Sequence, residues 1–152
     1  TRFTVGSALN MVPSDLEKEL KLTRKKVANG ADLILTQPIF DPPKAREFLM
    51  AYKDFHGEAL TVPIVAGLLP LYTARHAAFL HNEVPGINIP DDLLERMNKA
   101  DDAAKEGVKI AQELLLQIKE FLQGAYFMPP FGRYYLAAEV VEILHPQKAL
   151  EV

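Results

Sequence analysis

Short apolar runs alternate along the chain with longer segments in which apolar residues recur every three or four positions. The runs lie at residues 2–9, 31–40, 61–70 and 125–131, and their continuous Val, Ile, Leu and Phe content is typical of strands buried on both faces. The centres of the first three runs lie about thirty residues apart, which is the spacing of right-handed crossover units in a parallel sheet. The pattern therefore predicts four parallel strands, each leading into a helix.

The segments between these runs carry helix-starting and helix-ending residues. Ser14 and Glu17 have the spacing of a capping box, and Gly30 suits the left-handed conformation that closes a helix. Asp41 followed by Pro42 predicts the start of a second helix, and Gly57 predicts its end. Further helices are predicted at about 73–82, within 84–97, at 103–123 and at 134–144. The apolar stripe of the first helix is Leu16, Leu20, Thr23 and Val27, and that of the second helix is Ala45, Phe48, Leu49, Tyr52 and Phe55.

Four strand-helix units fit two architectures, namely half of a (β/α)8 barrel or a small open sheet. Both place functional residues at the carboxyl ends of the strands. The 152 residues are enough for one domain with a hydrophobic core. Because the chain begins at Thr1, inside an apolar run, we expect it to be a piece of a longer protein.

Polar residues interrupt the second apolar run at its end. Thr36 and Gln37 follow three consecutive apolar residues, and Ser7 and Asn10 hold comparable positions around the end of the first run. An amide at such a rim both donates and accepts hydrogen bonds, which suits a planar heterocycle with alternating polar edges. The alternative is that Gln37 only caps loop backbone.

Composition excludes several partners. A net charge of -3 provides no basic field for nucleic acid or anionic lipid. The chain has no cysteine, no long apolar stretch and no signal-like N-terminus, so we expect a soluble, cytoplasmic protein. No metal site is expected, because His76 and His81 are five residues apart and no carboxylate completes a ligand set.

Several residues have a structural interpretation beside a functional one. Asp91 and Asp92 follow a proline at a helix start, where negative charge is stabilised, so capping is preferred to acid-base catalysis. Lys26 lies late in a predicted helix, where a solvated lysine is also favoured. The aromatic cluster at 126–135 either stacks on a ligand ring or packs against its neighbours.

Four motifs, in order, resemble the methylenetetrahydrofolate reductase family. They are GADLILTQPIFD at 30–41, PIVAGLLPL at 63–71, FLHNEVPGINIP at 79–90 and GAYFMPPFGRY at 124–134. The likeness extends over about 3–144 and is strongest to the reductase portion of bacterial bifunctional homocysteine methyltransferase/methylenetetrahydrofolate reductases.

The resemblance implies a flavin-dependent (β/α)8 barrel that reduces 5,10-methylenetetrahydrofolate to 5-methyltetrahydrofolate. FAD would carry the hydride from NAD(P)H. Residues 1–152 would form a single partial domain, the C-terminal half of the barrel with its last four βα units. The family's glutamate general acid would lie in the missing N-terminal half, so this chain alone would be inactive.

Such a half-barrel has unpaired strand edges and is expected to associate. Its partner would be the missing N-terminal half or a second copy in a homo-oligomer. The alternative function is a non-catalytic unit for folding, oligomerisation or folate binding.

The resemblance also implies binding residues in two groups. Gln37 matches the glutamine that binds the pterin, and Lys26 matches the lysine near the FAD phosphate and ribityl groups. His76 stands where the family has Gln or Asn, and Leu80 stands where some members stack Phe on the aminobenzoyl ring. The cofactor-binding residues are thus Ser7, Asn10, Glu19 and Lys26, and the substrate-binding residues are Gln37, His76, Leu80 and Arg133.

Overall fold

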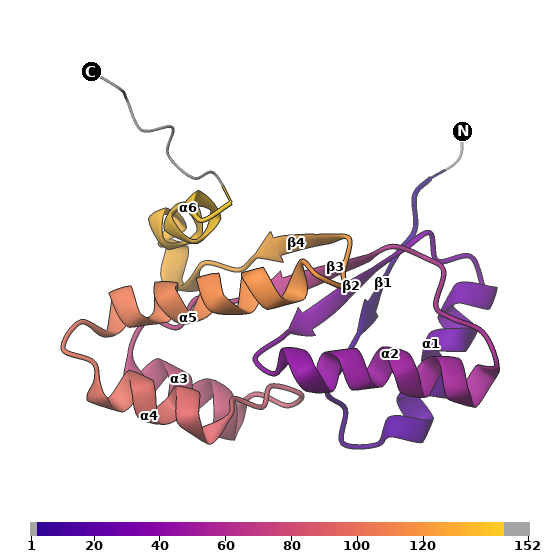
Figure 1. Cartoon of the computed structure of the whole chain (residues 1–152), viewed down its shortest axis with the longest axis horizontal. Coiled ribbons are helices and arrows are strands. Elements are labelled where there is room, and N and C mark those ends of the chain that lie inside the picture. Colours follow the sequence, from indigo (N-terminus) through magenta and orange to yellow (C-terminus); the bar gives the residue numbers. More distant parts are fainter. Residues whose placement is uncertain (1–2, 145–152) are drawn as a thin grey trace.

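The computed structural model describes residues 3–144, and its centre is one parallel sheet. The strands are β1 (Gly6–Leu9), β2 (Leu33–Pro38), β3 (Ile64–Leu68) and β4 (Gly124–Phe127). They pair in the order β1-β2-β3-β4, each parallel to its neighbour (Figure 1). The prediction of four parallel strands is therefore confirmed.

The order of the strands decides between the two architectures. An open doubly wound sheet reverses its strand order and carries helices on both faces, whereas a barrel adds strands sequentially and carries its helices outside. The strand order seen here is sequential. Because crossovers between parallel strands are generally right-handed, such an order places the helices on one face. In Figure 1, α2 and α5 run along the sheet and α3 and α4 lie together at one end. The helices are α1 (Leu16–Ala28), α2 (Pro42–His56), α3 (Ala74–Glu83), α4 (Asp91–Lys99), α5 (Ala103–Ile118) and α6 (Tyr134–Glu142), with a 3-10 turn η1 at Pro130–Gly132.

The two ends of α1 differ in how well the pattern predicted them. The capping box from Ser14 is wrong, because Asp15 is the N-cap and its carboxylate accepts from the Lys18 N–H at 3.0 Å. A carboxylate is the stronger acceptor at the positive end of a helix. Gly30 does close the helix, with φ of 96° and its N–H donating to the carbonyl of Val27 at 3.0 Å.

The second helix follows the prediction, whereas α5 ends early. Asp41 caps α2 and Gly57 ends it in the left-handed conformation. The predicted helix at 103–123 stops at Ile118. Gln123 pairs with Ile64 of β3 through both its backbone N–H, at 3.2 Å, and its side-chain oxygen, at 2.8 Å. That pairing requires the chain to leave the helix before β4 begins.

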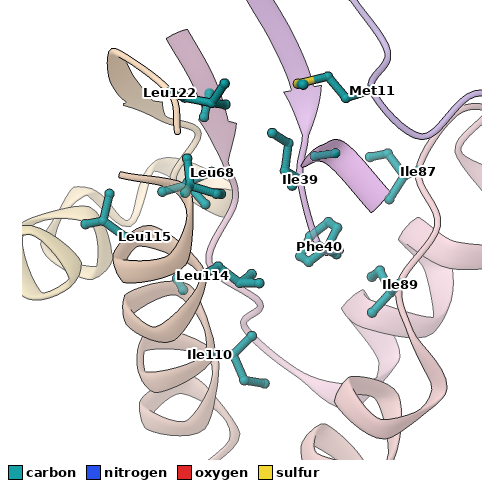
Figure 2. Packing of buried hydrophobic residues seen from close by; sticks show 14 of the residues in the cluster. Met11, Ile39, Phe40, Leu68, Ile87, Ile89, Ile110, Leu114, Leu115 and Leu122 are labelled. Carbon is teal, nitrogen blue, oxygen red and sulfur yellow. The ribbon is translucent and has the colours of Figure 1, made fainter. Parts of the chain in front are cut away.

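The hydrophobic core lies between the sheet and the helices. In Figure 2, side chains of α5 meet Leu68 of β3, and the segment after β2 meets the connection between α3 and α4. Every residue labelled there is buried. The labelled residues are Met11, Ile39, Phe40, Leu68, Ile87, Ile89, Ile110, Leu114, Leu115 and Leu122.

The opposite face of the sheet is open within residues 3–144. Leu35 is 37% exposed, so the expectation of a strand buried on both faces is wrong for the described chain. Its cross-strand partners, Ala8 and Val65, are small or apolar, and Gly6 and Ala8 of β1 are also exposed. Within the described residues, the first strand begins at Gly6, because its register with β2 extends over Gly6–Leu9.

Two residues of the predicted stripes lie at the surface. Leu16 and Phe55 are exposed, whereas Leu20, Thr23, Phe48 and the other central stripe residues are buried or half-buried. Leu16 and Phe55 occupy the terminal turns of α1 and α2, where a helix extends beyond the surface it packs on. Within residues 3–144, no helix combines the length and apolar content needed to cross a bilayer.

Candidate functional site

The carboxyl end of β2 carries a bulge. The register with β3 shifts between Leu35 and Pro38, so that Thr36 and Gln37 together stand opposite the single residue Ala66. Thr36 is 1% exposed and faces the helix layer. Gln37 is exposed on the open face of the sheet, at the edge where a barrel fold places its functional groups.

Thr36 holds this bulge with three hydrogen bonds. Its hydroxyl donates to the carbonyl of Gln37 at 2.7 Å and accepts from the buried N–H of Gly67 at 2.9 Å. Its own carbonyl accepts from the hydroxyl of Tyr126 at 2.7 Å. The side chain thus replaces part of the interrupted ladder, which explains a hydroxyl at the end of a buried strand.

Gly67 is required for this arrangement. A Cβ at this position would lie 2.8 Å from the carbonyl oxygen of Thr36 and 3.0 Å from the hydroxyl of Tyr126. The side chain of Met128 would also lie 3.0 Å away. Only glycine lets the β2 backbone and the phenol approach so closely.

Three of the four residues proposed to bind cofactor lie together at β1. The ammonium of Lys26 donates to the carbonyl of Ala8 at 2.6 Å and lies 3.6 Å from a carboxylate oxygen of Glu19. The same oxygen accepts from the N–H of Asn10 at 3.5 Å. The side chain of Lys26 is only 24% exposed, so it is not a freely solvated lysine. A partly buried cation therefore stands at the carboxyl end of β1.

Ser7 is placed differently from that cluster. It lies in β1 opposite Ile34, whose side chain is buried against the helices. Because side chains alternate along a strand, Ser7 faces the helix layer and not the open face.

Of the four residues proposed to bind substrate, His76 and Arg133 lie together beyond the ends of β3 and β4. The guanidinium of Arg133 lies 3.9 Å from the ring centroid of Tyr72 and 5.3 Å from that of Phe131. The ring of His76 is also 5.3 Å from that of Phe131. Within residues 3–144, no carboxylate forms an ion pair with Arg133. The cluster thus presents an aromatic-flanked cation.

His76 is neutral in the folded protein near neutral pH. Burial lowers its pKa from the ordinary value of 6.5. Its Nδ1 accepts from the N–H of Tyr72 at 3.3 Å, so a neutral ring carries its proton on Nε2. The ring therefore offers one N–H donor, whereas the amide of a glutamine offers two.

The lowered pKa of His76 has a consequence for stability. Well above pH 6.5 the ring is neutral in both the folded and the unfolded chain. Below about pH 6.5 the unfolded chain binds the proton more readily than the folded chain does. Stability from this residue is therefore present above pH 6.5 and decreases as the pH falls. We expect His76→Gln to reduce the loss of stability between pH 7.5 and 5, measured by urea unfolding. An unchanged loss in the variant would contradict this.

Leu80, which was proposed to contact substrate, is buried, whereas the large apolar side chain of Phe131 is exposed. Leu80 is 7% exposed and belongs to the hydrophobic core, so its contact with substrate stays a prediction that this position does not favour. Phe131 is 70% exposed and has φ of 55°, a left-handed conformation that is strained for a bulky residue. The sequence placed Phe131 in an aromatic cluster, but gave no sign of this backbone strain.

Acidic and histidine residues do not gather into a metal site in the described part of the chain. No group of three or more His, Cys, Asp or Glu side chains there could hold a metal ion. Asp91 and Asp92 lie in the first turn of α4, where negative charge is stabilised, but the N-cap is Pro90 and no side chain makes a capping hydrogen bond there.

These observations define a class of protein. It is an α/β protein whose sequential parallel strands form part of a (β/α)8 barrel, with amide, cationic and aromatic side chains at their carboxyl ends. Methylenetetrahydrofolate reductase is the family that matches residues 8–129. Since this match covers most of the chain, the chain belongs to the methylenetetrahydrofolate reductase family, and the resemblance seen in the motifs is confirmed.

Individual relatives agree with this assignment. Methylenetetrahydrofolate reductase 2 of Schizosaccharomyces pombe is 26% identical over 125 residues, and that of Saccharomyces cerevisiae is 24% identical over 131 residues. They match 79% and 86% of this chain, respectively. Methylenetetrahydrofolate reductase (NADH) 1 of Arabidopsis thaliana is 31% identical over 111 residues, or 70% of this chain. The matched parts are 19%, 21% and 18% of these relatives, so the chain spans about a fifth of their length.

A solved structure shares the fold. A Clostridium thermocellum protein that binds two copies of 5-methyl-5,6,7,8-tetrahydrofolic acid superposes with a TM-score of 0.69 and 19% identity. The match covers 93% of this chain and 52% of that protein. The four βα units therefore correspond to about half of a larger fold.

Proposed function

We propose that this chain supplies one half of the active site of an FAD-dependent reductase in the cytoplasm, which converts 5,10-methylenetetrahydrofolate to 5-methyltetrahydrofolate with NAD(P)H. The observation that carries the proposal is the position of Gln37. Its amide is exposed on the open face, at the carboxyl end of β2, in a chain that belongs to the methylenetetrahydrofolate reductase family.

Gln37 is suited to recognise the pterin of a folate. The pterin edge alternates hydrogen-bond donors and acceptors, and a primary amide pairs with such an edge through both its oxygen and its nitrogen. Because the bulge fixes the backbone on either side, the amide is presented from a rigid strand end. Rigid presentation limits the conformational entropy lost on binding.

The residues at β1 and β2 fit a flavin dinucleotide. A planar ring needs a flat apolar surface, and Gly6, Ala8, Leu33 and Leu35 provide small or aliphatic groups on the open face. Lys26 provides a cation for a phosphate at the end of β1. When bound, FAD would supply the hydride, while this chain would bind and orient its ring and phosphates.

His76 and Arg133 fit the rest of the folate. Arg133 would pair with a carboxylate of the glutamate tail, because a guanidinium that has no acidic partner among residues 3–144 favours such an anion. His76 would donate its Nε2 proton to a carbonyl oxygen. Leu80, Ser7, Asn10 and Glu19 remain in the proposal as the family resemblance placed them, with Leu80 the least favoured by its burial.

The remaining four βα units of the barrel would cover the open face. β1 and β4 each have one unpaired edge within the described sheet, and such edges are completed by further strands. Residues 1–152 would then be a single partial domain. The completing strands would come from an N-terminal half bearing the general acid or from a second copy in a homo-oligomer.

Replacing Gln37 with alanine tests the proposal. In the protein together with its completing half-barrel, we expect Gln37→Ala to lower kcat/KM for methylenetetrahydrofolate by about tenfold or more, which corresponds to about 1.4 kcal/mol. Reduction of the bound flavin by NADH should be unchanged, because the amide acts on the folate. Stopped-flow absorbance of the flavin measures the two half-reactions separately.

Gln117→Ala is the matched control. Gln117 is an exposed glutamine on α5, which packs on the helix side of the sheet, so both half-reactions should remain at their original rates. Equal losses in both half-reactions of Gln37→Ala would contradict a role in pterin recognition. A purified protein that neither binds flavin nor reduces folate would contradict the reductase function itself.

A second candidate is folate binding without reduction. It is favoured by the Clostridium thermocellum protein of the same fold, which binds 5-methyl-5,6,7,8-tetrahydrofolic acid. Isothermal titration with this folate in protein free of flavin separates the two. Saturable binding together with a failure to reduce the methylene substrate after flavin is added would favour the binding role.

A further inference from the structure

We infer that Tyr126 is a positioning residue for Gln37, acting through the backbone of Thr36. The inference rests on the proposed role of Gln37 in binding the pterin. It extends that role to a residue on β4 that does not itself need to touch the folate.

The phenol of Tyr126 spans one strand to reach β2. Tyr126 is paired in register with Gly67 of β3, and its hydroxyl donates to the carbonyl of Thr36 at 2.7 Å. The missing side chain of Gly67 leaves the path open, since a Cβ there would lie 3.0 Å from the phenol oxygen. The contact joins residues 90 positions apart in the chain.

The hydrogen bond to Tyr126 lies within the bulge. The N–H of Gly67 donates to the side-chain hydroxyl of Thr36. The carbonyl of Thr36 accepts from the hydroxyl of Tyr126, so this backbone acceptor has a donor from β4. Burial raises the pKa of Tyr126 from its ordinary value of 10.0, so the hydroxyl keeps its proton at neutral pH.

Hydrogen bonds therefore hold both backbone carbonyls that flank the Cα of Gln37. The carbonyl of Thr36, on the N-terminal side, accepts from Tyr126, and the carbonyl of Gln37 accepts from the hydroxyl of Thr36. Fixing both peptide planes fixes the backbone dihedral angles of Gln37, and these set the direction of its Cα–Cβ bond. Tyr126 thus controls where the amide points, although the two side chains lie on different strands.

Tyr126→Phe isolates the hydroxyl and keeps the ring. In the reductase with its completing half-barrel, we expect KM for methylenetetrahydrofolate to rise about threefold to tenfold, with flavin reduction by NADH unchanged. Tyr52→Phe is the control, since Tyr52 is a buried tyrosine on α2, on the helix side of the sheet. It should leave both half-reactions unchanged.

A double variant shows whether Tyr126 acts through Gln37. Once Gln37→Ala has removed the amide, adding Tyr126→Phe should cause little further loss, because the two changes disrupt the same interaction. Independent, additive losses would overturn the inference while leaving the reductase function in place. A Gln37→Ala variant with normal folate kinetics would instead contradict the proposed role of Gln37.

Hydrogen exchange gives a measurement that needs no substrate. In Tyr126→Phe, the amide of Gly67 should exchange faster than in the original protein, because the bulge that holds it is loosened. Exchange over α5 (Ala103–Ile118) should be unchanged. An unchanged rate at Gly67 would overturn the inference whatever the enzyme assay shows.

Discussion

Replacing Gly107 with alanine is expected to lower the free energy of unfolding by roughly 3 kcal/mol or to prevent folding. Gly107 lies near the start of α5, where a glycine in a helix interior is otherwise unfavourable. A residue with higher helix propensity would therefore be expected to stabilise the isolated helix. The tertiary contact reverses that expectation.

The reason is the approach of α5 to the segment after β3. A Cβ on Gly107 would stand 2.6 Å from the carbonyl carbon of Leu71 and still closer to its oxygen. Leu71 is fully buried, so its backbone has no free space to move into. Relief requires α5 to shift away from the sheet, and this would separate the core residues Ile110 and Leu114 from their neighbours.

Equilibrium urea unfolding measures this effect, with Gly124→Ala as the matched control. Gly124 receives the same substitution, but its Cβ would lie 3.8 Å from Val65, which is ordinary contact. Gly124→Ala should change the free energy of unfolding by only about 0.5 kcal/mol. Equal effects at the two glycines would show that α5 does not pack on Leu71 as closely as described.

Thr36→Val is expected to destabilise by about 2 kcal/mol, whereas Thr23→Val should stabilise by about 1 kcal/mol. Both threonines are fully buried, and the substitution keeps the shape of the side chain. The Thr36 hydroxyl is the acceptor for the buried N–H of Gly67, which valine would leave without a partner. The hydroxyl of Thr23, in contrast, has no hydrogen-bond partner among residues 3–144.

The test is whether the two substitutions change the free energy of unfolding in opposite directions. Both variants are measured by urea unfolding under the same conditions, and each serves as the control for the other. If both destabilise by the same amount, the hydroxyl of Thr23 has a partner in solution. If Thr36→Val has no effect, the bulge in β2 does not depend on the threonine.

Much of the fold could be predicted because its elements are encoded locally. Asp41 and Gly57 specify the ends of α2 through capping and a left-handed glycine, which depend on nearby residues alone. The end of α5 at Ile118 could not be predicted, because it depends on pairing between Gln123 and Ile64, 59 positions apart. A hydrophobic pattern carries no information about such a distant pairing.

The candidate site was predictable to the level of strand ends, but not of individual contacts. Gln37 lies at the rim of a strand as predicted, because parallel strands place their carboxyl ends at one edge. The burial of Leu80 was not evident, since a leucine on an amphipathic helix can face either way near the edge of its stripe. The strain at Phe131 and the bond from Tyr126 to Thr36 appear only in three dimensions.

The sequence by itself determined the four βα units, their family and the polar residues at the strand ends, because periodicity, caps and motifs act over a few residues. The tertiary structure alone decided the bulge at Thr36 and Gln37, the glycine contacts at Gly67 and Gly107, and the cluster around Arg133. The physical reason is that a close approach of two backbones or rings depends on how segments far apart in the chain pack together. Packing of that kind is set by the shape of the whole core.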